Sequence, residues 1–235
     1  FEARGLMIAA ISHDLRTPLT RLRMRLETAV ADRTQRRRFA ADVEEMNTLI
    51  DAVLEVWLGG QAGAGATVDV LFGDAEPGGR LAESIPVHVA QLPSDRNFPG
   101  RPRQVEYREA MNVGYRFHDT DGVPAQFPFG FGLSYTRFAW SGLEIAPGNQ
   151  AGESVIRCTV TNSGARTGDE VVQLYVRRPN AAIAQPVLAL RGFQRVTLAP
   201  GARTEVVFRV DSLLPGDEVR LAASSRDTRL VGRVP

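Results

Sequence analysis

The residues most able to do chemistry lie near the N-terminus, where a histidine is followed by two polar side chains at helical spacing. His13 and Asp14 are adjacent, and Thr17 lies one helical turn beyond His13. A neutral imidazole has one ring nitrogen free to act as a nucleophile, and a carboxylate that holds the other ring N–H fixes the tautomer and raises the nucleophilicity. The pattern predicts a nucleophilic His13 oriented by Asp14. The alternative is a surface histidine without a role.

Two helices are expected to position this histidine, because apolar residues recur at steps of three and four in residues 1–58. The first stripe consists of Ile8, Ile11, Leu15, Leu19, Leu22, Leu26 and Ala29, and the second of Phe39, Val43, Met46, Ile50, Val53 and Trp57. The polar segment 31–35 suits a short connection, so we expect an antiparallel helical hairpin with His13 facing away from the first stripe. A homodimeric four-helix bundle would bury both stripes.

The sequence around His13 resembles the phosphoacceptor box of sensor histidine kinases. Residues 11–22 read Ile-Ser-His-Asp-Leu-Arg-Thr-Pro-Leu-Thr-Arg-Leu, and residues 42–50 resemble the second helix of the same hairpin. The resemblance implies that His13 accepts a phosphoryl group and that Asp14 orients the ring and takes part in acid–base chemistry. It also implies that Thr17 positions a water for phosphatase action and that a response regulator is the partner.

The ATP-binding domain that follows this hairpin in histidine kinases has no counterpart in the sequence. The segment 130–132 (Gly-Phe-Gly) is too short to be a nucleotide-binding glycine box. We therefore expect no cofactor and no use of ATP by that route. The chain would receive a phosphoryl group from another protein or pass one to a response regulator.

Composition and charge argue against several other classes. The net charge of the 235 residues is +1, which gives no bias toward nucleic acid, and the basic cluster 33–38 is interpreted as a solvated face. Cys158 is the only cysteine, so neither an internal disulfide nor a thiolate metal site is expected. No apolar stretch reaches the length of a membrane span and no signal peptide is visible, which favours a cytoplasmic location.

The composition changes near residue 59, before which glycine and proline each occur once. Residues 64–72 could form a short helix, and the glycine-rich segment 73–79 predicts a turn. Residues 87–135 contain many prolines, glycines and aromatic residues, so we expect long, partly ordered loops that pack on another element.

From residue 152 onward polar and apolar residues alternate, and turn residues separate the alternating segments. This pattern predicts an antiparallel β-sandwich. The expected strands cover residues 155–161, 171–176, 187–198 and 204–210.

Motifs after residue 53 resemble the C-terminal part of family 3 glycoside hydrolases, which are typified by β-glucosidases. Residues 127–138, Phe-Pro-Phe-Gly-Phe-Gly-Leu-Ser-Tyr-Thr-Arg-Phe, are close to a signature of that family. Residues 56–81 resemble the end of its α/β sandwich domain, and residues 160–176 and 190–196 resemble its fibronectin type III-like domain.

The resemblance implies that the catalytic residues of this family are missing. Glycoside hydrolysis needs two carboxylates at the scissile bond; the family's nucleophile comes from an absent N-terminal barrel, and its acid/base glutamate lies upstream of residue 53. The available carboxylates Asp69, Asp74, Glu76 and Glu83 match no catalytic motif and are interpreted as caps or surface residues. The chain also looks shortened over residues 210–218, which puts the last sandwich strands in question.

Two further expectations concern apolar surface. The aromatic residues Phe127, Phe129, Phe131 and Tyr135 predict core or interdomain packing, and the alternative is a platform for stacking sugars. The remnant of the α/β domain would lack partners for its apolar side chains, so partial disorder or adhesion to neighbouring elements is expected within residues 60–125.

Together these features predict a multi-domain α+β chain. It comprises an antiparallel helical hairpin (1–58), a remnant of an α/β sandwich domain with connecting loops (59–140) and a fibronectin type III-like β-sandwich (141–235). The predicted function is that of a mosaic, part phosphoacceptor and part non-catalytic tail of a β-glucosidase, inactive alone. The alternatives are a fragment of a β-glucosidase-type hydrolase of carbohydrate metabolism and a non-functional fusion. Expected partners are a second copy, a response regulator and a weakly bound saccharide.

Overall fold

The computed structural model describes residues 55–57, 60–95, 97, 100, 104, 106–150, 152–179 and 186–235. The chain divides into two compact units, Phe1–Asp74 and Ala75–Pro235. Residues 1–54 of the predicted helical hairpin, with His13, Asp14 and Thr17, lie outside the described residues. Residues 55–57, which were expected to end its second helix, are described and are not helical, and Trp57 has φ 51°. Each unit is considered by itself.

In the first unit the predicted short helix is confirmed as α3 (Gly63–Phe72). The helix ends at Gly73, which adopts the left-handed conformation (φ 79°) that glycine reaches without steric cost. None of the ten residues of α3 is buried, and Val68, Leu71 and Phe72 are exposed, the last to 70%. The described residues of its unit therefore leave the apolar side chains of α3 exposed.

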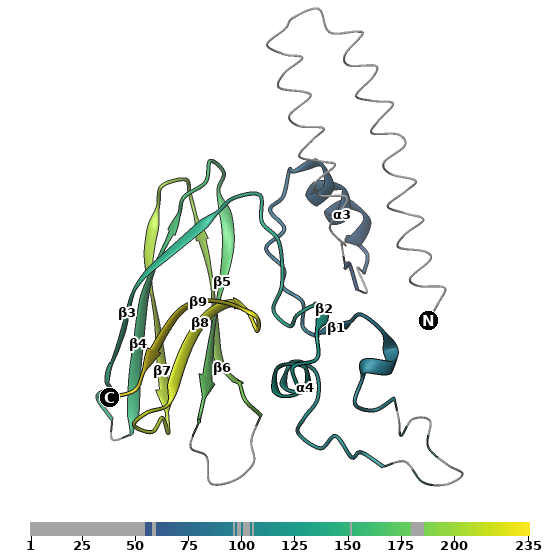
Figure 1. Ribbon diagram of the computed structural model, residues 1–235. Helices are drawn as coiled ribbons and strands as arrows, with labels where there is room; N and C mark the ends of the chain where they lie inside the picture. The colour runs from purple at the N-terminus through teal and green to yellow at the C-terminus, as the bar shows by residue number, and fades with distance from the viewer. Residues whose placement is uncertain are drawn as a thin grey trace, which may run out of the picture. The chain divides into compact units, whose positions relative to one another are not determined.

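The second unit contains the predicted antiparallel β-sandwich (Figure 1). One sheet has the strand order β3-β4-β7 and the other the order β6-β5-β8-β9, and all neighbouring strands are antiparallel. The strands are β3 (Phe138–Pro147), β4 (Glu153–Asn162), β5 (Gly168–Arg177), β6 (Ala189–Leu198), β7 (Arg203–Asp211), β8 (Glu218–Ser224) and β9 (Asp227–Arg233).

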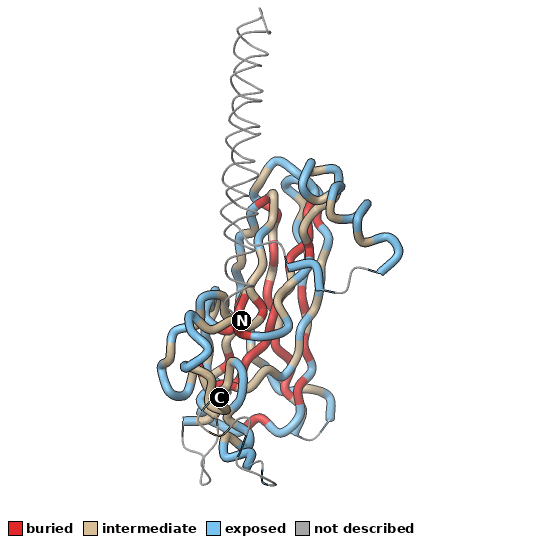
Figure 2. Tube along the Cα trace, turned by 90° about the vertical axis from the view of Figure 1, so that its right-hand side faces the viewer, coloured by how far each residue is buried: buried red, intermediate tan, exposed pale blue. Residues whose placement is uncertain are grey.

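The alternating pattern explains how the two sheets bury one common core. In β4 the side chains of Ile156, Cys158 and Val160 are at most 1% exposed, while the residues between them point to the other face. Cys158 lies opposite Val206 of β7, so the inward residues of both strands meet in one layer. Figure 2 shows the resulting buried positions along the inner strands. This core belongs wholly to residues of the second unit.

The last two strands of the sandwich form, so the doubt raised by the shortened segment 210–218 is corrected. Strand β8 pairs with β5 and β9 pairs with β8, and Val219 and Leu221 are fully buried. A tight turn joins β7 to β8, closed by a hydrogen bond from the Asp217 N–H to Leu214 O at 3.0 Å. In this turn Asp217 accepts a hydrogen bond from the Leu214 N–H and pairs with Arg178.

The loops that precede the sandwich contain β1 (Ile85–Pro86), the short 3₁₀ helix η1 (Val89–Gln91), α4 (Tyr115–Thr120) and β2 (Ala125–Phe127). Segments 76–84 and 115–136 contact the sandwich, in agreement with the expectation that these loops need a partner. Between these segments Val87, Val89, Tyr107 and Met111 are exposed. Strands β1 and β2 pair antiparallel. In Figure 1 this region lies beside the sheet that contains β5 and β6.

A second, smaller cluster of apolar side chains joins these loops to the sandwich. Its buried members are Tyr175, Leu188 and Ala222, and Tyr115 and Phe129 pack against them. Among the described residues, no helix is long and apolar enough to cross a membrane.

Candidate functional site

A group of polar contacts lies where two segments, 76–84 and 127–136, meet the start of β5. We call these two segments the paired segments. They bond to each other through the backbone: the Leu81 N–H donates to Phe131 O and the Gly130 N–H donates to Leu81 O, both at 2.8 Å. They position every side chain of the site that does not come from the sheet.

Glu76 ties the two paired segments together. Its carboxylate accepts a hydrogen bond from the Ser134 hydroxyl and another from the Tyr135 N–H, the latter at 3.1 Å. The Thr136 hydroxyl then donates to Asn162 Oδ1 at 2.7 Å, which links the segment to the end of β4. Glu76 was interpreted as a cap or surface residue, and the structure assigns it this linking role.

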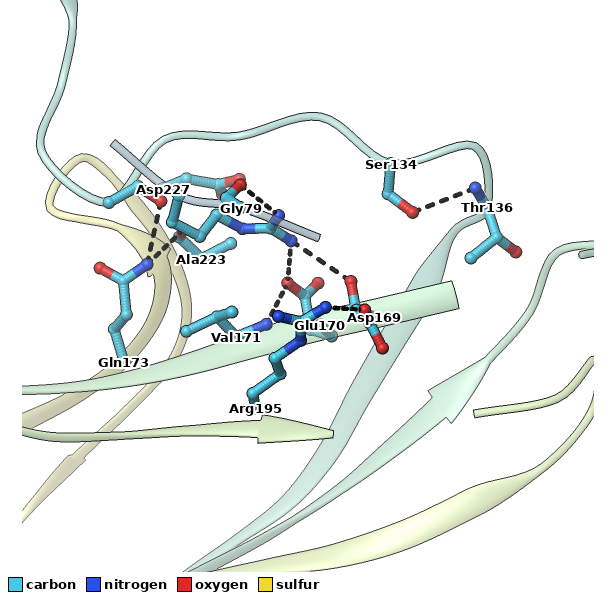
Figure 3. Close-up of polar contacts among 12 residues, drawn as sticks. Gly79, Ser134, Thr136, Asp169, Glu170, Val171, Gln173, Arg195, Ala223 and Asp227 are labelled. Carbon is cyan, nitrogen blue, oxygen red and sulfur yellow. Dashed lines mark hydrogen bonds and ion pairs between the residues drawn. The ribbon is translucent and has the colours of Figure 1, made fainter. Parts of the chain in front are cut away.

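Arg80 connects the first paired segment to β5. Its guanidinium donates to Glu170 Oε1 at 3.0 Å, and both side chains are at most 9% exposed. Asp169, the preceding residue, accepts hydrogen bonds from Arg195 and Thr197. Figure 3 shows Asp169, Glu170 and Arg195 drawn together at this end of the sheet. Such charge-assisted pairs are stronger than neutral hydrogen bonds.

The electrostatics of this group keep Asp169 ionised. Burial acts to raise the pKa of Asp169, but the hydrogen bonds from Thr197 and Arg195 and the positive charges of Arg195 and Arg80 outweigh burial and lower the pKa. A carboxyl group with a lowered pKa holds no proton near neutral pH. Asp169 is therefore unsuited to act as a general acid there.

Gln173 of β5 forms the other polar connection to the paired segments. Its side-chain amide donates to Gly130 O at 3.0 Å and to Ala223 O at 2.7 Å, and its oxygen accepts from the Tyr175 hydroxyl. Gly130 has φ 78°, and a Cβ atom there would lie 2.0 Å from Gln173 Oε1. Only glycine allows this close approach.

The aromatic residues of the region are used for packing. The Tyr115 ring lies 5.0 Å from the Phe129 ring and 5.9 Å from the Tyr175 ring, measured between centroids. Tyr175 is fully buried, and this burial raises its pKa. Phe127 and Phe131 contact each other at 5.6 Å. Two interpretations of this motif were open, core packing and a platform for stacking sugars. The contacts of Phe129 agree with core packing.

The remaining predicted carboxylates do not gather into a site. Asp69, Asp74 and Glu83 are exposed. Within the described ranges, no group of three or more His, Cys, Asp or Glu side chains is arranged to hold a metal ion. Cys158 is buried, and burial together with the charge of Glu205 raises its pKa to about 11, so the thiol stays protonated. The group around Glu76, Arg80 and Asp169 holds segments together and offers no free acid–base pair.

The sequence did not predict that the charged side chains of Glu76, Arg80 and Asp217 are held in place by partners. Their partners lie far away in the sequence, for example 90 residues between Arg80 and Glu170. One signal was present: two consecutive acidic residues, Asp169 and Glu170, come just before the apolar run Val171–Val176 of the predicted strand. Buried carboxylates require partners, so the pair could have prompted a search for arginines.

The fold and this site define the class of the second unit: a fibronectin type III-like β-sandwich joined to the end of a hydrolase domain. Family comparisons agree. The Fibronectin type III-like domain matches residues 170–213, and the Glycosyl hydrolase family 3 C-terminal domain matches residues 34–135. The His Kinase A (phospho-acceptor) domain matches residues 3–56. The predicted mosaic is thus confirmed at the level of family matches, and two of the matches overlap over residues 34–56.

Individual relatives are β-glucosidases and related enzymes that share the C-terminal part. Thermostable beta-glucosidase B of Acetivibrio thermocellus is 44% identical over 164 residues, which cover 69% of this chain and 22% of the relative. An exo-alpha-(1->6)-L-arabinopyranosidase of Bifidobacterium breve is 41% identical over 159 residues, covering 68% of this chain and 21% of the relative. The chain spans about a fifth of the length of these relatives.

Solved structures show the same relationship. The GH3 beta-glucosidase of Bifidobacterium adolescentis superposes with a TM-score of 0.72 at 39% identity, covering 77% of this chain and 29% of that structure. Beta-glucosidase 3B of Thermotoga neapolitana, solved with glucose, gives a TM-score of 0.74 at 35% identity, covering 80% of this chain and 28% of that structure.

Proposed function

We propose that residues 59–235 act as the non-catalytic C-terminal part of a β-glucosidase-type hydrolase, and that this chain alone does not hydrolyse glycosides. In this proposal the boundary between the hydrolase-domain remnant and the fibronectin type III-like sandwich lies near residue 140. The observation that carries the proposal is the use of the site's carboxylates: Glu76, Asp169 and Glu170 each accept hydrogen bonds that fix the paired segments to the sheet. They are not left free as the two carboxylates that glycoside hydrolysis requires.

Turnover of an aryl β-glucoside by the whole chain tests this proposal. We expect a rate equal to that of the enzyme-free solution. Matched variants Glu76→Gln, Asp169→Asn and Glu170→Gln separate genuine activity from a contaminating host enzyme, because a contaminant would be unaffected by them. Turnover that disappears in one of the three variants would overturn the proposal.

We propose a second function for residues 1–58: a homodimeric phosphoacceptor hairpin with His13 as acceptor, Asp14 as the orienting acid–base group and Thr17 as the residue that positions water. The specific observation in its favour is the phospho-acceptor domain match over residues 3–56. A response regulator would be the phosphotransfer partner. Joined to the hydrolase-type tail, the hairpin makes the chain a mosaic without a complete catalytic site of either parent family.

Chemical phosphorylation with phosphoramidate tests His13 without requiring a kinase. We expect acid-labile phosphohistidine at His13, absent in His13→Ala and reduced in Asp14→Asn. His88 is exposed and is followed by Val89, so it serves as an internal reference for a histidine without an adjacent carboxylate. Equal labelling of His13 and His88 would contradict a special reactivity of His13. The molar mass of the full chain tests dimerisation: twice 25.7 kDa supports the bundle, and 25.7 kDa contradicts it.

A further inference from the structure

The segment that follows α4 combines a reactive dipeptide with an open backbone. Asp121 and Gly122 form the only Asp-Gly pair in the sequence. Both residues are exposed, Asp121 is the C-cap of α4, and Gly122 has φ 66°. A Cβ atom at Gly122 would meet no atom within 4 Å, so the loop tip is uncrowded. Loop tips of this kind are also where local opening costs least.

The Gly122 amide is available as a nucleophile. Among the described residues it has no hydrogen-bond acceptor, whereas the preceding Asp121 N–H donates to Phe117 O at 2.9 Å. The Asp121 side chain has one hydrogen bond among the described residues, from Asn112 Nδ2 to Oδ2 at 3.2 Å, and this bond is exposed. Within the described residues, no strong hydrogen bond therefore keeps the Gly122 nitrogen and the Asp121 carboxyl group apart.

We propose that Asp121 is a site of spontaneous isomerisation to isoaspartate, which makes it a methyl acceptor for an isoaspartyl carboxyl methyltransferase that uses S-adenosylmethionine. The Gly122 nitrogen attacks Asp121 Cγ; a C–N bond forms, the nitrogen loses its proton and the carboxyl OH leaves as water. Water then opens the five-membered succinimide. Cleavage at the main-chain carbonyl yields isoaspartate, and cleavage at Cγ restores aspartate, so mass and oxidation state are unchanged.

The position of this site gives the modification a structural consequence. Isoaspartate adds one methylene to the main chain before Gly122, two residues ahead of Val123, whose carbonyl oxygen contacts His118 Nδ1 at 3.1 Å and accepts from Arg226 at 3.1 Å. Arg226 also donates to Asp119 Oδ1 and to His118 O, and so attaches α4 to the β8–β9 turn. Displacement of Val123 weakens this attachment. Isomerisation would thus loosen α4 from the sandwich whether or not the chain has an activity.

Ageing of the intact chain at neutral pH tests the proposal. The tryptic peptide 117–137 contains both Asp121 and Asp119, and Asp119 is the matched control because its side chain is 9% exposed, paired with Arg226 and followed by Thr120. We expect isoaspartate at residue 121 only, forming no more than about tenfold slower than in the free synthetic peptide because the loop opens locally. Labelling by the methyltransferase should rise in parallel.

Two variants distinguish the intrinsic reactivity of the Asp-Gly pair from the effect of the folded structure on the isomerisation rate. Asp121→Glu keeps the charge but should abolish labelling, since a six-membered imide forms far more slowly. Asn112→Ala removes the one hydrogen bond on the carboxyl group and should raise the rate severalfold. No isoaspartate in the folded chain when the free peptide is half converted, or equal amounts at Asp119, would overturn the site.

Hydrogen exchange of the aged chain tests the structural consequence. The Leu190 N–H is bonded to the Tyr115 hydroxyl at 2.9 Å and the Val187 N–H to Thr120 Oγ1 at 3.0 Å, so both report on the attachment of α4. We expect both amides to exchange faster in the isomerised fraction. Unchanged exchange would overturn the loosening of α4.

Discussion

Apolar side chains are buried in the sandwich core but exposed in helix α3. In β5, Val172 and Leu174 are fully buried between two sheets that the same unit supplies. In α3, Val68, Leu71 and Phe72 remain exposed within theirs. Local sequence forms both elements, but only the sandwich strands carry enough neighbouring strands to remove their apolar surface from water. A sequence can therefore form a helix without burying its apolar side chains. Such a helix is weakly stabilised, since most helical stability in proteins comes from packing.

The largest effect is expected from Leu174→Ala in β5, because this side chain is fully buried. Removing a buried leucine side chain costs about 2–5 kcal/mol of unfolding free energy. Leu71→Ala in α3 is the matched control, with a change below about 0.5 kcal/mol, as for an exposed site. Urea unfolding measures both. Equal losses would mean that α3 is as well packed as β5.

The next effect is expected from Arg178→Met, which leaves Asp217 without its partner. The side chain of Asp217 is 2% exposed, and Arg178 contacts it through two nitrogens at 2.8–3.1 Å. Breaking a buried ion pair on one side costs about 3 kcal/mol. Arg229→Met breaks a pair whose side chains are 44% and 49% exposed and should cost less than about 1 kcal/mol. A similar cost for both variants would contradict the special role of the β7–β8 turn.

Acidification should destabilise the sandwich through its two fixed aspartates. Burial acts to raise the pKa of Asp217, but hydrogen bonds from Arg178 and Leu214 and the charges of Arg178 and Arg191 lower it, and the pKa of Asp169 is also lowered. Because the folded pKa lies below the unfolded value of about 3.9, this contribution is present above that value and lost as the pH falls through the folded pKa. Urea midpoints between neutral and acidic pH should fall less steeply in Asp217→Asn. An unchanged slope would argue against this linkage.

The smallest effect is expected from Glu76→Gln in the paired segments. The amide oxygen still accepts from the Tyr135 N–H, so only the charge on these bonds is lost, at a cost of about 1 kcal/mol. Glu83→Gln, at an exposed position, is the control and should be neutral. Thermal unfolding measures the difference. A neutral Glu76→Gln would show that the backbone bonds between the paired segments suffice.

The sequence predicted strands β4, β5, β6 and β7 and missed β3, β8 and β9. The alternation of apolar and polar residues around Ile156, Cys158 and Val160 predicted β4. The same alternation in residues 204–210 predicted its neighbour β7. Register shifts interrupt two of the pairings that involve missed strands, at Ser141/Glu144 in β3 and at Leu221/Ala222 and Ala222/Ser224 in β8 and β9. A one-residue shift moves side chains to the other face, so the alternation is lost in the sequence while the pairing persists.

The site was less predictable than the fold. The turn residues and the aromatic motif indicated that residues 127–136 pack closely. The close approach of Gly130 to the Gln173 side chain agrees with that prediction. The ionic partners could not be paired, because a single sequence does not tell which arginine faces Asp217 across 39 residues. The roles of His13, Asp14 and Thr17 stay predictions, since these residues lie outside the described part of the chain.

The boundary between Asp74 and Ala75 has a consequence for the history of such chains. The family match over residues 34–135 runs across this boundary, yet the contacts of Glu76 and Arg80 are made to residues after it. A genetic crossover just upstream of codon 75 would leave these contacts in one inherited piece. A crossover between residues 87 and 124 would separate β1 from β2 and Glu76 from Tyr135. A junction upstream of residue 75 therefore keeps the contacts of the paired segments within one unit, whereas a junction between residues 87 and 124 would divide them.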